Sequence, residues 1–254
     1  VRLDGVGFIG GKKISLDILS GAPLQGSVKM KAVILQHLEI EGPGLLKNLL
    51  VERGIAMETV YPEKQEIPEA DIYIAMGGPM SVNDNNEWLK KEIDTIKQHV
   101  ESGGFYFGTC LGAQLLAKAI GGTVSEGKRE VGGFEAEVTS EGSKETLLQG
   151  LGEKLKVFHW HGETFSILPE EAVVIATGNG MNQAFKYKNA YGLQFHLEPD
   201  ANMVFSWIKA DEDYVTGAGT NRDDVMKNFE ENMNAYTDTL KIIFNRFLDG
   251  TNER

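Results

Sequence analysis

The chain has 254 residues, of which 41% are hydrophobic and 24% charged, as in ordinary globular proteins that bury their own core. The formal net charge of −12 argues against nucleic acid as a partner, because phosphate binding needs clustered Lys and Arg. The single cysteine excludes an intramolecular disulfide and a cysteine-rich metal site. No apolar run reaches the roughly 18 residues of a membrane span, and the N-terminus does not resemble a secretory signal, so we expect a cytoplasmic protein without membrane contact.

The first 29 residues are Gly-rich and have no helical stripe, whereas MKAVILQH, from Met30 onward, is typical of the first buried strand of an α/β domain. We therefore expect residues 1–29 to be an N-terminal extension outside the native domain and residues 30–249 to form one domain. The alternative is a short edge hairpin, with ISLDIL as one strand.

From Met30 onward, short apolar runs alternate with amphipathic segments. Strands are expected over residues 32–37, 57–61, 71–76 and 105–107, and helices over residues 43–53, 86–101 and 111–120. This βαβ alternation predicts an open, mostly parallel sheet with helices on both faces. Further short strands are expected over residues 131–138, 156–159, 173–177, 183–187 and 191–195, and a long amphipathic helix over residues 223–248.

Cys110 lies in a setting typical of a catalytic nucleophile. A strand (FYF) leads directly into Gly-Thr-Cys-Leu-Gly, and a helix follows at once. The flanking glycines permit a sharp turn that exposes the thiol at the carboxyl edge of the sheet, and the helix N-terminus favours a thiolate. A buried structural cysteine, the alternative, requires none of these features.

A cysteine nucleophile needs a base and a group that orients this base. His196 follows an apolar strand, and Glu198 lies two residues on, so both side chains point the same way in an extended chain. The alternative for His196 is a hydrogen-bonded core histidine. His159 and His161 share the same spacing, but without a nearby cysteine or a clear acidic third ligand they indicate a metal site only weakly.

The strand over residues 71–76 continues into Gly-Gly-Pro, a tight turn with exposed backbone N–H groups. Either this is an ordinary turn, or it supplies one donor of an oxyanion hole while the residue after Cys110 supplies the other.

Three motifs together, GTCLGAQ, GGPMS and QFHLE, resemble the class I (triad) glutamine amidotransferases, and HWHGETF resembles the stand-alone proteins similar to the glutaminase domain of GMP synthase. The resemblance covers most of residues 30–200. It implies a flavodoxin-like α/β fold with a small antiparallel β element, a Cys110–His196–Glu198 triad and no cofactor or metal. It also implies an oxyanion hole at Gly78 and Leu111, and a substrate pocket containing Met80, Gln114, His161 and Gly162. Leu197 stands where the family usually has proline.

The resemblance leaves three functions open. The chain could hydrolyse the γ-carboxamide of glutamine or of a γ-glutamyl compound, or it could be a glutaminase subunit that supplies ammonia to a separate synthase. It could also be an inactive binding module on this fold. A proteolytic role for Cys110 is a lesser alternative. The sequence contains no Gly-rich nucleotide loop such as S-G-G-x-D-S, which would belong to a domain that uses the released ammonia. We therefore expect the stand-alone hydrolase rather than the glutaminase subunit.

Overall fold

The structure is a computed structural model that describes residues 7–9, 12–14 and 30–252. Within the first 29 residues, β1 (Gly7–Ile9) pairs antiparallel with β2 (Lys12–Ile14) in a two-stranded sheet of its own. The strand expected over residues 14–19 lies, apart from Ile14, outside the described residues. The division between residues 1–29 and the domain stays a prediction.

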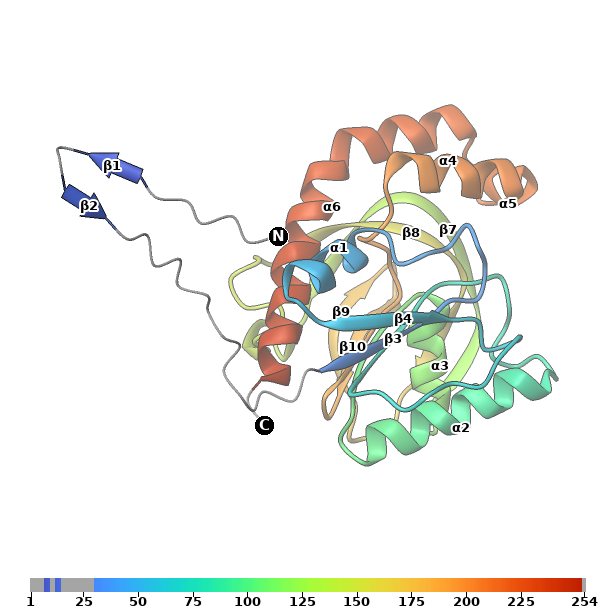
Figure 1. Ribbon diagram of the computed structural model, residues 1–254. Helices are drawn as coiled ribbons and strands as arrows, with labels where there is room; N and C mark the ends of the chain where they lie inside the picture. The colour runs from blue at the N-terminus through green and yellow to red at the C-terminus, as the bar shows by residue number, and fades with distance from the viewer. Residues whose placement is uncertain (1–6, 10–11, 15–29, 253–254) are drawn as a thin grey trace.

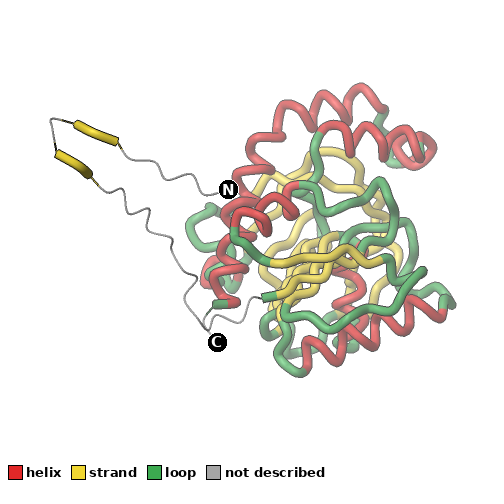
Figure 2. The backbone as a smooth tube through the Cα atoms, viewed as in Figure 1, coloured by secondary structure: helices red, strands yellow, loops and turns green. Residues whose placement is uncertain are grey.

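A nine-stranded sheet forms the centre of the domain, in the order β4-β3-β5-β6-β11-β10-β9-β7-β8 (Figures 1 and 2). The first five strands are parallel: β4 (Ala56–Val60), β3 (Lys31–Leu35), β5 (Ile72–Ala75), β6 (Phe105–Thr109) and β11 (Ala190–Leu193). The other four are antiparallel: β10 (Met181–Tyr187), β9 (Val173–Gly178), β7 (Thr123–Val138) and β8 (Lys154–Ile167). The predicted α/β fold with a mostly parallel sheet is confirmed, and its antiparallel part comprises four strands.

Helices cover both faces of the parallel strands, as Figure 1 shows. On one side lie α1 (Leu45–Glu52) and the 30-residue α6 (Arg222–Thr251), and on the other α2 (Glu87–Glu101) and α3 (Leu111–Ala119). Three shorter helices were not predicted: α4 (Ala201–Ala210), α5 (Glu212–Gly217) and a 3-10 turn over Gly142–Lys144. Among the described residues, no helix is long and apolar enough to cross a membrane.

The alternation of side chains along the central strands divides the interior into two cores. In β3, Ala32 and Ile34 pack in the core that contains α1 and α6, whereas Val33 and Leu35 pack with α2 and α3. Successive residues of a strand point to opposite faces, and both faces are covered here, so these strands are apolar throughout. The parallel arrangement brings the carboxyl ends of β3, β5, β6 and β11 to one edge of the sheet.

Candidate active site

Cys110 occupies the sharp turn between β6 and α3, with φ +50°, a conformation rare for residues other than glycine. The glycines on either side are required by close packing. A Cβ at Gly108 would lie 2.5 Å from the carbonyl carbon of Gly112, and one at Gly112 would collide with the carbonyl of Ala75. The predicted nucleophile elbow is therefore present as a backbone conformation.

His196 and Glu198 follow β11, the parallel neighbour of β6, so the chain brings them to the same sheet edge as Cys110. Nδ1 of His196 lies 2.6 Å from Oε1 of Glu198, and both side chains are buried. The backbone N–H of Leu197 donates to Oε2 of Glu198 at 3.0 Å, a bond that proline could not make. The carboxylate is therefore held through both oxygens.

The imidazole of His196 is adjacent to the Cys110 thiol. Burial opposes charging of the ring, but the charge of Glu198 and the neighbouring Cys110 side chain hold the pKa of His196 well above its usual value. The thiol itself donates to the carbonyl of Trp160 at 3.6 Å, and Nε2 of His196 has no hydrogen-bond partner among the described residues.

The turn after β5 lies beside the start of α3. A Cβ at Gly78 would lie 2.8 Å from the Leu111 side chain, so the two predicted oxyanion donors belong to adjacent backbone segments. Nδ1 of His37 contacts the Gly77 carbonyl at 3.2 Å, and its Nε2 contacts Glu92 at 3.0 Å. Both ring nitrogens therefore face acceptors, which fits an imidazolium.

A cavity of about 690 Å³ opens beside Cys110. Four predicted pocket residues, Met80, Gln114, His161 and Gly162, line it together with Gly78. Nε2 of Gln114 donates to the Glu163 carbonyl at 3.1 Å, which fixes this amide at the cavity wall. Leu111, His196 and Glu198 are buried behind the lining. Further lining residues are Leu38, Ile40, Glu41, Pro79, Ser81, Glu126, Gly127, Arg129, Trp160, Glu163, Trp207, Ala210, Asp211 and Tyr214.

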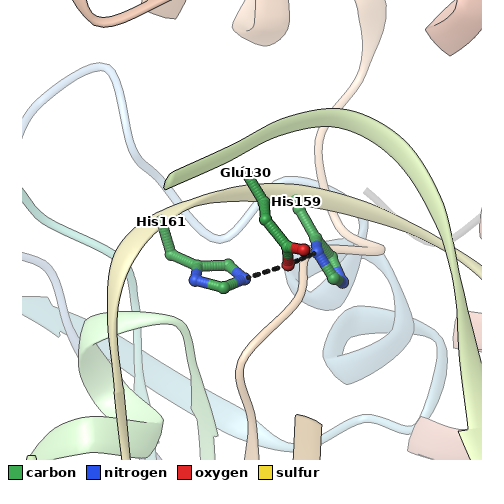
Figure 3. Close-up of side chains that lie close together, drawn as sticks. All are labelled: Glu130, His159 and His161. Atoms are coloured by element: carbon green, nitrogen blue, oxygen red, sulfur yellow. Dashed lines mark hydrogen bonds and ion pairs between the residues drawn. The ribbon is translucent and has the colours of Figure 1, made fainter. Parts of the chain in front are cut away.

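Glu130, His159 and His161 form a buried cluster on the paired strands β7 and β8 (Figure 3). Their donor atoms lie within 4.8 Å of one another, so Glu130 supplies the acidic third group that sequence reasoning missed. However, Oε2 of Glu130 lies only 2.6 Å from Nδ1 of His159 and 3.3 Å from Nε2 of His161. Two ligands of one tetrahedral zinc ion lie roughly 3.3 Å apart. The shorter distance is that of a hydrogen bond, so the cluster is better described as a carboxylate bonded to imidazole.

The groups of this cluster affect the pKa values of Glu130 and His159. Burial opposes ionisation of Glu130, but hydrogen bonds from His159, His161 and Asn179 lower the pKa of this carboxyl. Burial, assisted by the neighbouring histidines, lowers the pKa of His159. The cluster therefore presents His161 to the cavity from a support that carries a negative charge.

Comparisons with known proteins identify the family of this chain. The sequence model of the glutamine amidotransferase class-I family matches residues 44–203. The chain belongs to this family. It is 30% identical to the glutamine amidotransferase-like protein YfeJ of Salmonella typhimurium over 182 residues, which cover 66% of this chain and 76% of YfeJ. It is 26% identical to a glutamine-hydrolysing GMP synthase subunit from Methanococcoides burtonii, over 66% of this chain and 88% of the relative.

Solved structures of the family share the fold. A glutamine amidotransferase from Thermotoga maritima superposes with a TM-score of 0.79 at 26% identity, covering 87% of this chain and 99% of that chain. One from Methylobacillus flagellatus gives 0.79 at 27% identity, over 88% and 96% of the two chains. By contrast, the match to the GMP synthase of Thermotoga petrophila covers only 35% of that longer enzyme.

Proposed function

We propose that this amidotransferase is a cysteine-dependent amide hydrolase that acts on the γ-carboxamide of glutamine or of a γ-glutamyl compound. The observation that carries the proposal is the 2.6 Å contact between Nδ1 of His196 and Glu198, next to a Cys110 held at positive φ. A strained nucleophile, a base and a group that orients the base meet at one sheet edge.

In the acylation step, Cys110 transfers its proton to Nε2 of His196, and the sulfur attacks the γ-carbonyl carbon. The resulting oxyanion accepts hydrogen bonds from the N–H groups of Gly78 and Leu111. The carbon–nitrogen bond then breaks, the nitrogen takes the proton from His196, and ammonia or an amine leaves. A γ-glutamyl thioester remains on Cys110.

In the deacylation step, water attacks the thioester carbonyl and gives a proton to His196. The second oxyanion collapses, the carbon–sulfur bond breaks, the sulfur takes the proton back from His196, and glutamate leaves. The carboxylate of Glu198 stabilises the imidazolium that forms in each step. Met80, Gln114, His161 and Gly162 are proposed to bind the glutamyl moiety.

A second candidate is a glutaminase subunit that passes ammonia to a separate synthase, which the similarity to the Methanococcoides burtonii protein favours. The third candidate is an inactive binding module. The chemistry of the first two is the same up to the thioester, so only the acceptor differs.

Ammonia release from glutamine and cleavage of γ-glutamyl peptides by the pure protein test these proposals, with Cys110→Ala as the control. We expect wild-type turnover and a loss of at least about a thousandfold in Cys110→Ala. Full activity of Cys110→Ala would refute the mechanism. Glutamine hydrolysis that requires a partner protein would favour the second candidate. Neither turnover nor labelling by a glutamine-like electrophile would favour the binding module.

A further inference from the structure

Glu41 is a carboxyl group at the active site for which the proposed mechanism has no use. Its side chain is partly buried and lines the cavity beside Cys110. A Cβ at Gly77 would collide with this carboxylate and would lie 3.1 Å from Cε1 of His196, so Glu41 lies beside the base. Among the described residues, its carboxylate has no hydrogen-bond or ion-pair partner.

An ionised carboxyl withdrawn from water without a partner is energetically unfavourable. Accordingly, burial raises the pKa of Glu41, and the charges of His196 and His37 offset this effect only in part. Unpaired, desolvated groups in a cavity are candidates for ligand contacts, because a bound partner of opposite charge removes the penalty.

The wall around Glu41 is apolar and rigid. Leu38 and Ile40 lie on the same turn, and Trp207 of α4 donates from Nε1 to the Ile40 carbonyl at 2.8 Å. Nε2 of Gln36 donates to the carbonyls of Leu38 and Glu39, at 3.0 and 3.1 Å. These bonds hold the turn in place, so no loop needs to be ordered when a ligand binds.

Gln114, one of the residues proposed to bind the glutamyl moiety, belongs to another hydrogen-bonded part of the lining. Ser81 donates to Glu163 at 2.9 Å, and Gln114 donates to the Glu163 carbonyl. Glu41, by contrast, lies beside His196, which protonates the leaving nitrogen in the proposed mechanism. The leaving amine of the substrate, rather than its glutamyl moiety, would therefore contact Glu41.

The charged side chains of the cavity lining indicate which kind of leaving amine would bind. The lining contains four carboxyl side chains (Glu41, Glu126, Glu163 and Asp211) and one guanidinium, that of Arg129. Arg129 lies over the Tyr214 ring at 4.4 Å and has no ion pair among the described residues. An anionic leaving group would be repelled by this lining, whereas an alkyl chain that ends in an ammonium group fits apolar walls with a carboxylate.

We propose that Glu41 binds an ammonium group on the leaving amine, so that the preferred substrates are γ-glutamyl amides of diamines or longer polyamines. The inference rests on the proposed γ-glutamyl hydrolase function. Glu41 is a specificity residue in this proposal, since it contacts the leaving group and takes no part in proton transfer.

Two amides that differ only at the terminal group test the inference: γ-glutamylputrescine, which ends in an ammonium, and γ-glutamyl-n-pentylamide, which ends in a methyl. The wild type should show a kcat/KM about 10- to 100-fold higher for the ammonium amide, the range expected of a hydrogen bond between charged groups. Glu41→Gln should remove this preference by slowing the ammonium amide much more than the pentylamide. Glu39→Gln, an exposed neighbour that does not line the cavity, should retain it.

Equal rates on the two amides, equal losses on both in Glu41→Gln, or faster cleavage of γ-glutamylglycine would overturn the inference. Binding of both amides to a Cys110→Ala background, measured by calorimetry, separates this inference from the proposed function. A preference in binding that Glu41→Gln abolishes supports the site even if nothing is hydrolysed. Hydrolysis of the pentylamide without discrimination by charge supports the function and refutes the site.

Discussion

Nδ1 of His37 lies 3.2 Å from the carbonyl oxygen of Gly77. A peptide unit is planar and trans, so a fixed Gly77 carbonyl directs the N–H of Gly78 to the opposite side. A Cβ at Gly78 would lie 3.0 Å from Cβ of His37, so the His37 side chain packs against this turn. His37 therefore orients the backbone donor that the proposed mechanism uses for the oxyanion.

Removal of this contact should lower kcat. We expect His37→Leu, made together with Glu92→Met so that no buried carboxylate is left unpaired, to reduce kcat at least about tenfold while KM changes less. His37→Asn in the same Glu92→Met background keeps a donor near Gly77 and should recover part of the loss. Steady-state kinetics with glutamine check this, and equal kcat values for the two double variants would contradict it.

The buried His37–Glu92 pair should make stability depend on pH. Burial opposes charging of His37, but Glu92, the Gly77 carbonyl and Glu41 raise its pKa above the usual value. The stabilisation is therefore complete below pH about 6.5, the value for unfolded histidine, and is lost as pH rises through the folded pKa. Urea unfolding at pH 6 and pH 9 should show a larger free-energy difference between wild type and Glu92→Gln at pH 6. A difference that grows with pH would contradict this reading.

Gly112 should tolerate no side chain. A Cβ there would collide with the carbonyl of Ala75, so Gly112→Ala should lower the free energy of unfolding by about 1–3 kcal/mol despite its better helix propensity. Gly250, in α6, has nothing within 4 Å of an added Cβ, and Gly250→Ala should raise this free energy by about 0.5–1 kcal/mol. Urea unfolding of both variants gives the comparison, and the same sign for both would refute the packing argument.

The cluster around Glu130 should act without a metal ion. Because His159 and the carboxylate are at hydrogen-bond distance, we expect chelators to leave activity unchanged and the purified protein to carry far less than one zinc per chain. Elemental analysis and assays with and without a chelator check this. Stoichiometric zinc that disappears in Glu130→Gln would show instead that the cluster is a metal site.

Residues 1–29 should be dispensable for the domain. The nine-stranded sheet takes no strand from β1 or β2. We expect a chain that starts at Met30 to keep kcat within about twofold and its thermal midpoint within about 2 °C, the shift of a surface change. A large loss of either would show that these residues belong to the native domain.

Sequence alone was sufficient for the local features of the site. Two features depend only on neighbours within two residues: the elbow at Cys110 and the pair formed by His196 and Glu198. All the residues that form each feature therefore lie within one short sequence motif. The contacts of Glu130 and Glu41 were missed, because Glu130 meets His159 across 29 residues of chain and Glu41 reaches His196 only through the fold. Contacts between residues that are far apart in the chain leave no periodic pattern in the sequence.

Strands β7 and β8 are longer than predicted, because they extend beyond the apolar residues on which the prediction was based. β7 and β8 were expected from their apolar segments, but both continue through polar residues such as Glu126 and Glu163, which pair with each other near the cavity. The short helix α4 was missed although Asp200 caps it through the Met203 N–H at 2.9 Å. A single capping residue is a weak signal without a long apolar stripe behind it.

β8 contacts the site at three successive points: Phe158 pairs with His196, the Trp160 carbonyl accepts from Cys110, and the Glu163 carbonyl accepts from Gln114. One uninterrupted strand thus sets the spacing between base, nucleophile and substrate pocket. A residue added or removed between these points would turn the following side chains to the other face of the sheet. For protein engineering, the length of this segment should therefore be kept unchanged.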